Sequence, residues 1–244
     1  INPMIRELGA KSHLDFYCNN IEASRPNKDD HHCVISLGAG DCAVELQIVE
    51  HLVRSGLTNL DFTCMDLNDS VLERGRAQAI EKGLDQYMSF EVANINEWQQ
   101  TETYSSVIAH NSLHHFLELE QIFDRIKQAL KPGGKFITID MIGRNGHQRW
   151  PEALTLVEKY WHELPLSYRF NLQLNRMETE FSDWDCSTEG FEGIRSQDIL
   201  PLLVERFHFE EFLAFGNVIM PFVDRSFGHH LEPTTAWDSG FIDR

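Results

Sequence analysis

The most informative stretch of this chain is Val34-Ile35-Ser36-Leu37-Gly38-Ala39-Gly40-Asp41. In it, an apolar run leads directly into two closely spaced glycines. A helical pattern follows at 43–55, so the stretch predicts a buried strand, a glycine turn and a helix. Glycine lets the backbone approach a ligand closely, and the amides of the following helix lie beside it. An ordinary tight turn also explains such a pair of glycines, so the motif needs support from the rest of the chain.

Short apolar runs alternate with helical patterns from this motif as far as residue 141. Strands are expected at 60–65, 88–93, 104–110 and 135–141, and helices at 43–55, 69–83 and 118–130. The alternation predicts right-handed βαβ units, and therefore an α/β fold with a doubly wound, mostly parallel sheet. Ligands of such sheets bind at the carboxyl ends of the strands. The residues that follow each strand are therefore the candidates for a site.

Asp66 ends the second expected strand, 26 residues after Gly40. A carboxylate at that place accepts hydrogen bonds from both hydroxyls of a nucleoside ribose. A helix N-cap is the alternative, because Asn68 and Asp69 also precede a helix. No third glycine follows at Cys42, so the full glycine pattern of NAD- and FAD-binding domains is not met.

Five motifs in this order resemble those of class I S-adenosylmethionine (SAM)-dependent methyltransferases. They are VISLGAGD (34–41), CMDLN (64–68), VANI (92–95), VIAHNSLHHF (107–116) and LKPGGKFITID (130–140). The resemblance covers about residues 31–142. It implies a Rossmann-like sheet of seven strands, one of them antiparallel near the edge, with SAM as cofactor and methyl transfer as the reaction.

The resemblance also assigns the cofactor contacts residue by residue. They would be Gly38, Ala39 and Gly40 along the methionine part, Asp66 on the ribose, Leu67, Asn94 and Ile95 at the adenine, and His110 near the sulfonium. Three positions depart from the family pattern. Ser36 stands where an acidic residue is frequent, Cys42 where a third glycine is frequent, and Asn94 where Asp is usual. An amide oxygen still accepts a hydrogen bond from the exocyclic nitrogen of adenine.

The catalytic candidates are His114, His115 and Asp140, which follow the fourth and fifth strands. Methyl transfer to a hydroxyl or ammonium group needs a proton removed, and histidine titrates in the right range. A structural role is the alternative for both histidines, because the LHHF segment resembles one that is common across the family whatever the substrate.

Arg144, His147 and Arg149 follow the fifth strand and are the candidates for substrate binding. Either arginine is suited to clamp a substrate carboxylate, and salt bridges within an acidic cap are the alternative. His147 with His114, His115 or Asp140 would suit a two-histidine, one-carboxylate metal site. That spacing is not diagnostic, and the sequence-based expectation is a site without metal.

Charge and composition limit the partners of the chain. Lys and Arg number 21 against 38 Asp and Glu, a formal net charge of −17, and no basic cluster occurs. Such a surface repels a phosphate backbone, so we expect a small-molecule substrate and no nucleic acid. No apolar run approaches the roughly 20 residues that span a bilayer, so no membrane partner is expected. Five cysteines without a CxxC motif favour a reducing, cytoplasmic location. The sequence does not indicate an oligomeric state.

The strand–helix alternation divides the chain into four expected parts. They are an N-terminal helical segment (1–30), the SAM-binding core (31–142), an inserted helical lid (143–195) and a C-terminal part (196–244) that completes the core with a helix and edge strands. Helices are expected at 151–163, 166–178 and 196–206, and one or two final strands in the aromatic stretch 207–223. The lid would begin beside the cofactor and set substrate choice.

Methyl transfer from SAM to an O, N or C nucleophile of a small molecule is the favoured function. Three alternatives remain open. A cyclase of the same fold would consume SAM and release methylthioadenosine, a nucleotide-dependent oxidoreductase would bind a different cofactor, and a non-catalytic domain would bind SAM without turnover.

Overall fold

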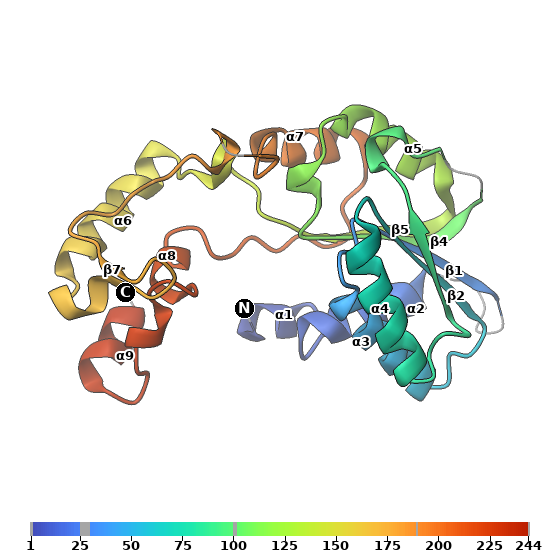
Figure 1. The fold of residues 1–244 in the computed structure, drawn as a ribbon, viewed down its shortest axis with the longest axis horizontal. Coiled ribbons are helices and arrows are strands. Elements are labelled where there is room, and N and C mark those ends of the chain that lie inside the picture. The colour runs from blue at the N-terminus through green and yellow to red at the C-terminus, as the bar shows by residue number, and fades with distance from the viewer. Residues whose placement is uncertain (1, 25–29, 100–101, 189, 244) are drawn as a thin grey trace.

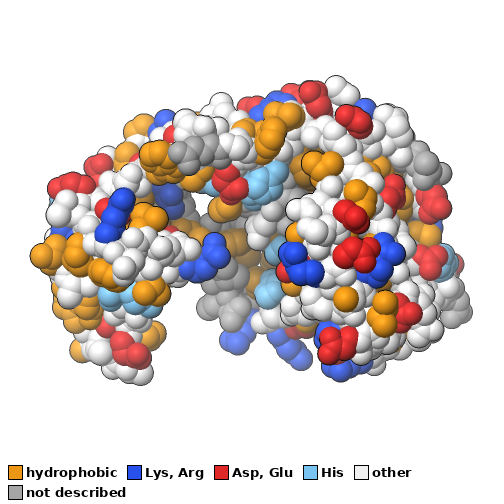
Figure 2. All heavy atoms as spheres, viewed as in Figure 1, with side chains coloured by type: hydrophobic (Ala, Val, Ile, Leu, Met, Phe, Trp, Pro, Cys, Tyr) orange, Lys and Arg blue, Asp and Glu red, His pale blue; other side chains and the backbone are white. Residues whose placement is uncertain are grey.

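The structure, a computed structural model, describes residues 2–24, 30–99, 102–188 and 190–243. The predicted N-terminal segment, 1–30, therefore includes six residues, 1 and 25–29, that lie outside the described ones. A lobe built on a β-sheet and a second lobe of helices form the two ends of an arch (Figure 1). The space-filling view shows a hollow between the lobes, with histidine and basic side chains around it (Figure 2).

The sheet confirms the predicted doubly wound, parallel architecture. Its strands are β1 (His32–Leu37), β2 (Leu60–Asp66), β3 (Met88–Val92), β4 (Tyr104–His110) and β5 (Leu130–Ile139). The order is β3-β2-β1-β4-β5, and each neighbouring pair is parallel. The chain reverses direction across the sheet between β1 and β4, and at such a switch point the connections leave a crevice for ligands.

Helices cover both faces of this sheet because alternate residues of its strands point to opposite sides. They are α2 (His13–Ala23), α3 (Ala43–Arg54) and α4 (Asp69–Glu81) on one face, and α5 (Leu119–Ala129) and α7 (Ser196–Arg206) on the other. Val34 packs into the first core and its neighbour Ile35 into the second, each without exposed surface. A short helix α1 (Asn2–Glu7) precedes α2. The apolar strands are thus buried on both faces, as parallel sheets require.

The second lobe has a hydrophobic core of its own. It contains α6 (Pro151–Glu163), α8 (Met220–Val223), α9 (Ala236–Ile242) and a two-stranded antiparallel hairpin, β6 (Phe170–Asn171) and β7 (Arg176–Met177). Trp161 and Phe227 meet edge to face at 4.9 Å in its centre. Two straps join the lobes. One is formed by the neighbouring segments 143–150 and 183–195 (of which 183–188 and 190–195 are described), and the other is the segment 207–217 (Figure 1).

The structure differs from two expectations for this lobe: the helix at 166–178 and the helical character of the whole inserted segment. The helix predicted at 151–163 is α6, but a 3-10 turn and the hairpin replace the helix predicted at 166–178. Asn171 explains the difference, because its Oδ1 accepts a hydrogen bond from the Leu174 amide at 3.0 Å and closes a turn. Segment 143–195 is accordingly only partly helical, and a helical cap is not confirmed.

The prediction of one or two final strands in 207–223 is wrong. This stretch contains no strand, Met220–Val223 is a helix, and the main sheet of the described residues has five strands instead of seven. Pro221 lacks the amide hydrogen that a central strand needs and suits the first turn of a helix. Phe207 instead packs its ring against Phe136 of β5 at 5.4 Å, so its apolar surface is partly buried without strand pairing.

Among the residues that the structure describes, no helix is both long enough and apolar enough to cross a membrane.

Candidate functional site

The glycine turn after β1 is held tightly against the neighbouring strands. Gly38 and Ala39 both donate backbone hydrogen bonds to the Met65 carbonyl, at 2.8 and 3.0 Å. Gly38 has a φ of +75°, and a Cβ placed on it would lie 2.6 Å from the Cβ of Ser112. Both the left-handed backbone and the close approach therefore require glycine at this position.

Asp66 links this turn to the end of β2. Its Oδ2 accepts the Gly40 amide at 2.8 Å and its Oδ1 accepts the Asn68 amide at 2.9 Å. The N-cap of α4 is Asn68, whose side chain accepts the Ser70 amide. Asp66 is therefore not the N-cap of α4. A Cβ on Gly40 would meet no atom within 4 Å, so the turn borders open space beside this carboxylate.

Glu45 lies beneath the turn and was not found by sequence reasoning. It is 3% exposed, and the Ser36 hydroxyl donates to its Oε1 at 2.7 Å. Burial raises the pKa of Glu45 to about 7, and the hydrogen bond from Ser36 offsets part of that rise. A carboxylate thus sits beside the position where the family often carries an acid. The spacing of Glu45 from Ile48, Val49 and Leu52 could have indicated that it is buried, because all four lie on the same face of α3.

The predicted adenine contacts lie past the ends of β2 and β3. Leu67 is 68% exposed, whereas Ile95 is buried. The Oδ1 of Asn94 accepts the Asn96 amide at 3.1 Å and caps the 3-10 helix Ile95–Glu97. An adenine amino group that donated to Asn94 Oδ1 would share this oxygen with the Asn96 amide.

At the end of β4, His110 meets a tyrosine from the N-terminal helix. The Tyr17 hydroxyl and His110 Nδ1 are 2.9 Å apart and form a hydrogen bond. Tyr17 has no exposed surface, and burial raises its pKa well above 10. Burial also lowers the pKa of His110. Both groups are therefore neutral at neutral pH, beside the expected position of the sulfonium.

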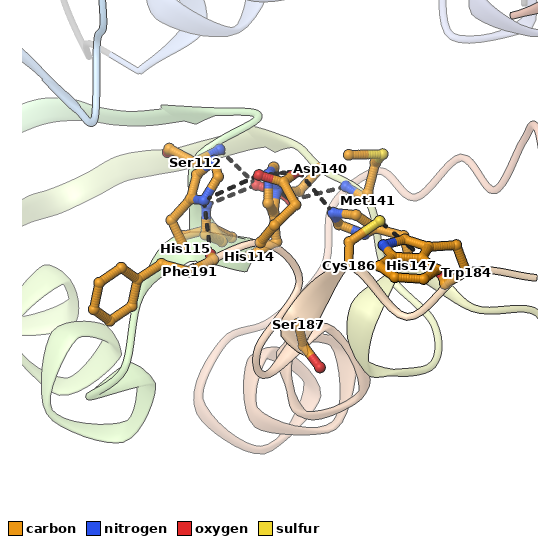
Figure 3. A network of polar contacts seen from close by, with 12 residues as sticks. Ser112, His114, His115, Asp140, Met141, His147, Trp184, Cys186, Ser187 and Phe191 are labelled. Atoms are coloured by element: carbon orange, nitrogen blue, oxygen red, sulfur yellow. Dashed lines mark hydrogen bonds and ion pairs between the residues drawn. The ribbon is translucent and has the colours of Figure 1, made fainter. Parts of the chain in front are cut away.

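Asp140, at the end of β5, organises the turn that carries His114. Its Oδ2 accepts the amides of Ser112 and Leu113 at 2.9 and 2.8 Å. Its Oδ1 accepts the Met141 amide at 2.8 Å and lies 2.6 Å from His114 Nδ1 (Figure 3). The Asp140 side chain is 2% exposed and the His114 side chain 3%. Since its oxygens already accept four hydrogen bonds, Asp140 is suited to position the turn and to orient His114.

His115 and His147 complete a cluster of three imidazole rings. The side chain of His115 is 42% exposed, and its Nδ1 lies 2.8 Å from the Phe191 carbonyl. The Nε2 of His147 lies 3.0 Å from Glu192 Oε1. His147 has a φ of +59°, uncommon for a residue with a side chain. Figure 3 shows His147 approaching the adjacent pair His114 and His115 from another segment. Glu192 was not predicted, because nothing near it in sequence marks it as a ligand.

The two arginines predicted to bind substrate lie in the loop after β5. Arg144 donates to the carbonyl of Arg149 at 3.0 Å, and Arg149 donates to the carbonyl of His147 at 3.1 Å. Neither guanidinium forms an ion pair with any carboxylate of the described residues. Salt bridges to the described carboxylates of segment 143–195 therefore do not hold either guanidinium.

The predicted residues thus form two neighbouring groups at one edge of the sheet. The group at β1, β2 and β3 comprises Gly38, Ala39, Gly40, Asp66, Leu67, Asn94 and Ile95. The group at β4 and β5 comprises His110, His114, His115, Asp140, Arg144, His147 and Arg149. Tyr17, Glu45 and Glu192 join them from segments outside the predicted motifs.

Comparison with known proteins finds a family model that matches part of the chain and several more distant relatives. The sequence model of a family described as "Methyltransferase domain" matches residues 35–136. The ubiquinone/menaquinone biosynthesis C-methyltransferase UbiE of Rickettsia massiliae is 23% identical over 190 residues, which cover 76% of this chain and 71% of that protein. A highly reducing polyketide synthase, NEC1 of Pyricularia oryzae, is 28% identical over 114 residues, 44% of this chain and 4% of that protein.

Solved structures match more distantly. An O-methyltransferase from a trans-AT polyketide synthase of Brevibacillus brevis, in complex with S-adenosyl-L-homocysteine (SAH), has a TM-score of 0.45 at 15% identity. The match covers 66% of this chain and 54% of that one. Coclaurine N-methyltransferase bound to N-methylheliamine and SAH has a TM-score of 0.43 at 20% identity, covering 52% of this chain and 34% of that one. The chain thus spans about a third to a half of these structures.

Proposed function

We propose that the chain transfers the methyl group of SAM to an O, N or C nucleophile of a small molecule, because residues 35–136 match the sequence model of a methyltransferase domain and the ordered motifs resemble those of class I SAM-dependent methyltransferases. SAM supplies an electrophilic methyl group on a sulfonium. The observation that carries the proposal is the pairing of Gly40 with Asp66 beside the group at β4 and β5. In this arrangement, the residues proposed to bind the nucleoside of SAM lie next to side chains that can orient a substrate.

The first group of residues fits the cofactor. A carboxylate offers about four lone-pair sites, and Asp66 uses two of them for backbone amides. The remaining sites suit the two ribose hydroxyls. The open space at Gly40 leaves room for the methionine part along the turn.

The second group would act on the substrate. Since a carbonyl oxygen only accepts, His115 Nδ1 carries the proton in its bond to Phe191, and Nε2 keeps a lone pair. That nitrogen belongs to a half-exposed ring, so His115 is better placed than the buried His114 to take a proton from a nucleophile. Most of the rate enhancement would come from alignment of the reacting atoms.

The substrate is proposed to be small and to carry an anionic group. Among the described residues, the guanidinium groups of Arg144 and Arg149 donate to backbone carbonyls and to no carboxylate, and a substrate carboxylate or phosphate would supply one. The overall charge of −17 makes a nucleic acid a poor substrate.

Product analysis tests this function. The chain is incubated with SAM and a panel of small acids that carry hydroxyl, amine or activated carbon groups, and the products are identified by mass spectrometry. Methylated product with SAH is expected. Methylthioadenosine would indicate the cyclase alternative, and SAM binding without turnover on any substrate would favour a non-catalytic role. Asp66→Ala is the inactive variant, and Asp69→Ala removes a nearby exposed carboxylate as its control.

A further inference from the structure

Three side chains from three separate segments meet around one carboxylate oxygen. His114 comes from the turn after β4, His147 from the loop after β5, and Glu192 from the segment before α7. The Nε2 atoms of His147 and His114 lie 3.0 and 3.6 Å from Glu192 Oε1. One ligand atom from each residue can be chosen so that all three lie within 4.8 Å of one another.

These distances match the edges of a metal coordination shell. Bonds of about 2.0–2.2 Å in a tetrahedron separate the ligand atoms by about 3.4 Å. The two measured separations bracket this value.

The proton position on His114 favours an ion at this point, whereas His147 Nε2, which donates to Glu192 Oε1 at 3.0 Å, would release its proton to bind one. His114 Nδ1 donates to Asp140 at 2.6 Å, so Nε2 of the neutral ring presents a lone pair. That lone pair faces the Glu192 carboxylate at 3.6 Å, too far for a hydrogen bond. A cation between the two acceptors would replace this repulsion with attraction.

The cluster has the support that metal-binding histidines need. Metal ligands of this type usually donate their second ring nitrogen to a carboxylate, as His114 does to Asp140. On the other side, the Gly146 amide donates to the Gly193 carbonyl at 2.8 Å and ties the His147 loop to the Glu192 segment. Both glycines have positive φ, so the backbone on each side is shaped to bring the two ligands together.

We propose that His114, His147 and Glu192 bind one divalent transition-metal ion of the zinc type. Two imidazoles and one carboxylate favour such an ion over Mg²⁺ or Ca²⁺, which prefer oxygen ligands. Three protein ligands leave a coordination position for water or a substrate oxygen. The ion would hold both ends of segment 143–195 against the sheet lobe. Its binding does not depend on methyl transfer, but a role in orienting the substrate rests on the proposed function.

Cobalt titration tests the site directly. The untagged chain is stripped with a chelator, dialysed and titrated with CoCl₂ while visible absorption is followed, and bound metal is counted by mass spectrometry. One Co²⁺ per chain is expected, displaced by ZnCl₂ and not by MgCl₂, with a rise in melting temperature. The absence of saturable one-to-one binding in the wild-type chain would overturn the proposal.

Variants locate the ion. Glu192→Gln, which keeps the side-chain shape, should weaken Co²⁺ binding by roughly 100-fold or more, and Asp140→Asn by roughly 10- to 100-fold. Glu180→Gln is the matched control, because Glu180 also lies 3.6 Å from a histidine, His162, but on an exposed surface. Equal affinity in Glu192→Gln and Glu180→Gln would place the ion elsewhere and refute the assignment. SAH binding to the metal-free chain, measured by calorimetry, tests the methyltransferase proposal separately.

Discussion

Glu45→Gln is expected to stabilise the protein at pH 8 and to leave its stability at pH 4 nearly unchanged. The wild-type carboxyl has a pKa of about 7 in the folded chain against an ordinary value of 4.5, because it is buried beneath the glycine turn. Between these values the folded state holds a proton that the unfolded state releases, so stability falls as pH rises. At 1.36 kcal/mol per pH unit, the full loss above pH 7 is about 3 kcal/mol.

Glutamine removes this loss because an amide does not ionise, and its oxygen can still accept the Ser36 hydroxyl. The assay is urea denaturation of both chains at pH 4 and pH 8, followed by circular dichroism. Glu81→Gln, an exposed position on α4, is the control and should show no such pH dependence. The reasoning is refuted if the difference between the Glu45→Gln and wild-type free energies of unfolding is the same at both pH values.

Three further predictions follow from the site. Asp66→Ala should weaken SAM binding by about 1.5–3 kcal/mol in calorimetry, and unchanged affinity would contradict the ribose assignment. Gly38→Ala should lower the melting temperature more than Gly83→Ala. Both glycines have positive φ, but only a Cβ at Gly38 meets another side chain, so equal losses would argue against the close packing. Segment 144–195 should gain protection from hydrogen exchange when SAH and substrate bind, and equal protection in both states would count against a mobile lid.

The sheet lobe could be predicted because its signals are local. Residues 32–43 contain the strand, the turn and the start of the helix within a short stretch. The LKPGG segment was predicted as a turn before a strand at 135–141, but it lies within β5 (Leu130–Ile139), whose pairing with β4 shifts register between Tyr104 and Ser106. Gly38 could be marked as a required glycine, although its reason, the side chain of Ser112, lies 74 residues away.

The contacts that complete the site could not be predicted, because they join distant parts of the chain. Tyr17 reaches His110 across 93 residues, and His147 reaches Glu192 across 45. The sequence around Tyr17 does not indicate a contact with His110, and the sequence around His147 does not indicate a contact with Glu192. The aromatic stretch 207–223 was misassigned for the opposite reason: its local pattern resembles a strand, but Phe207 buries its ring against the sheet lobe without pairing.

The two straps between the lobes limit how the molecule can deform. A body held by a single linker can swivel in every direction, whereas one held at two separated places keeps only the rotation about the line that joins them. Segments 143–150 and 190–195 are joined by the hydrogen bond between Gly146 and Gly193, so they behave as one attachment, and 207–217 is the other. The second lobe therefore has one easy degree of freedom, a swing that widens or narrows the hollow between the lobes.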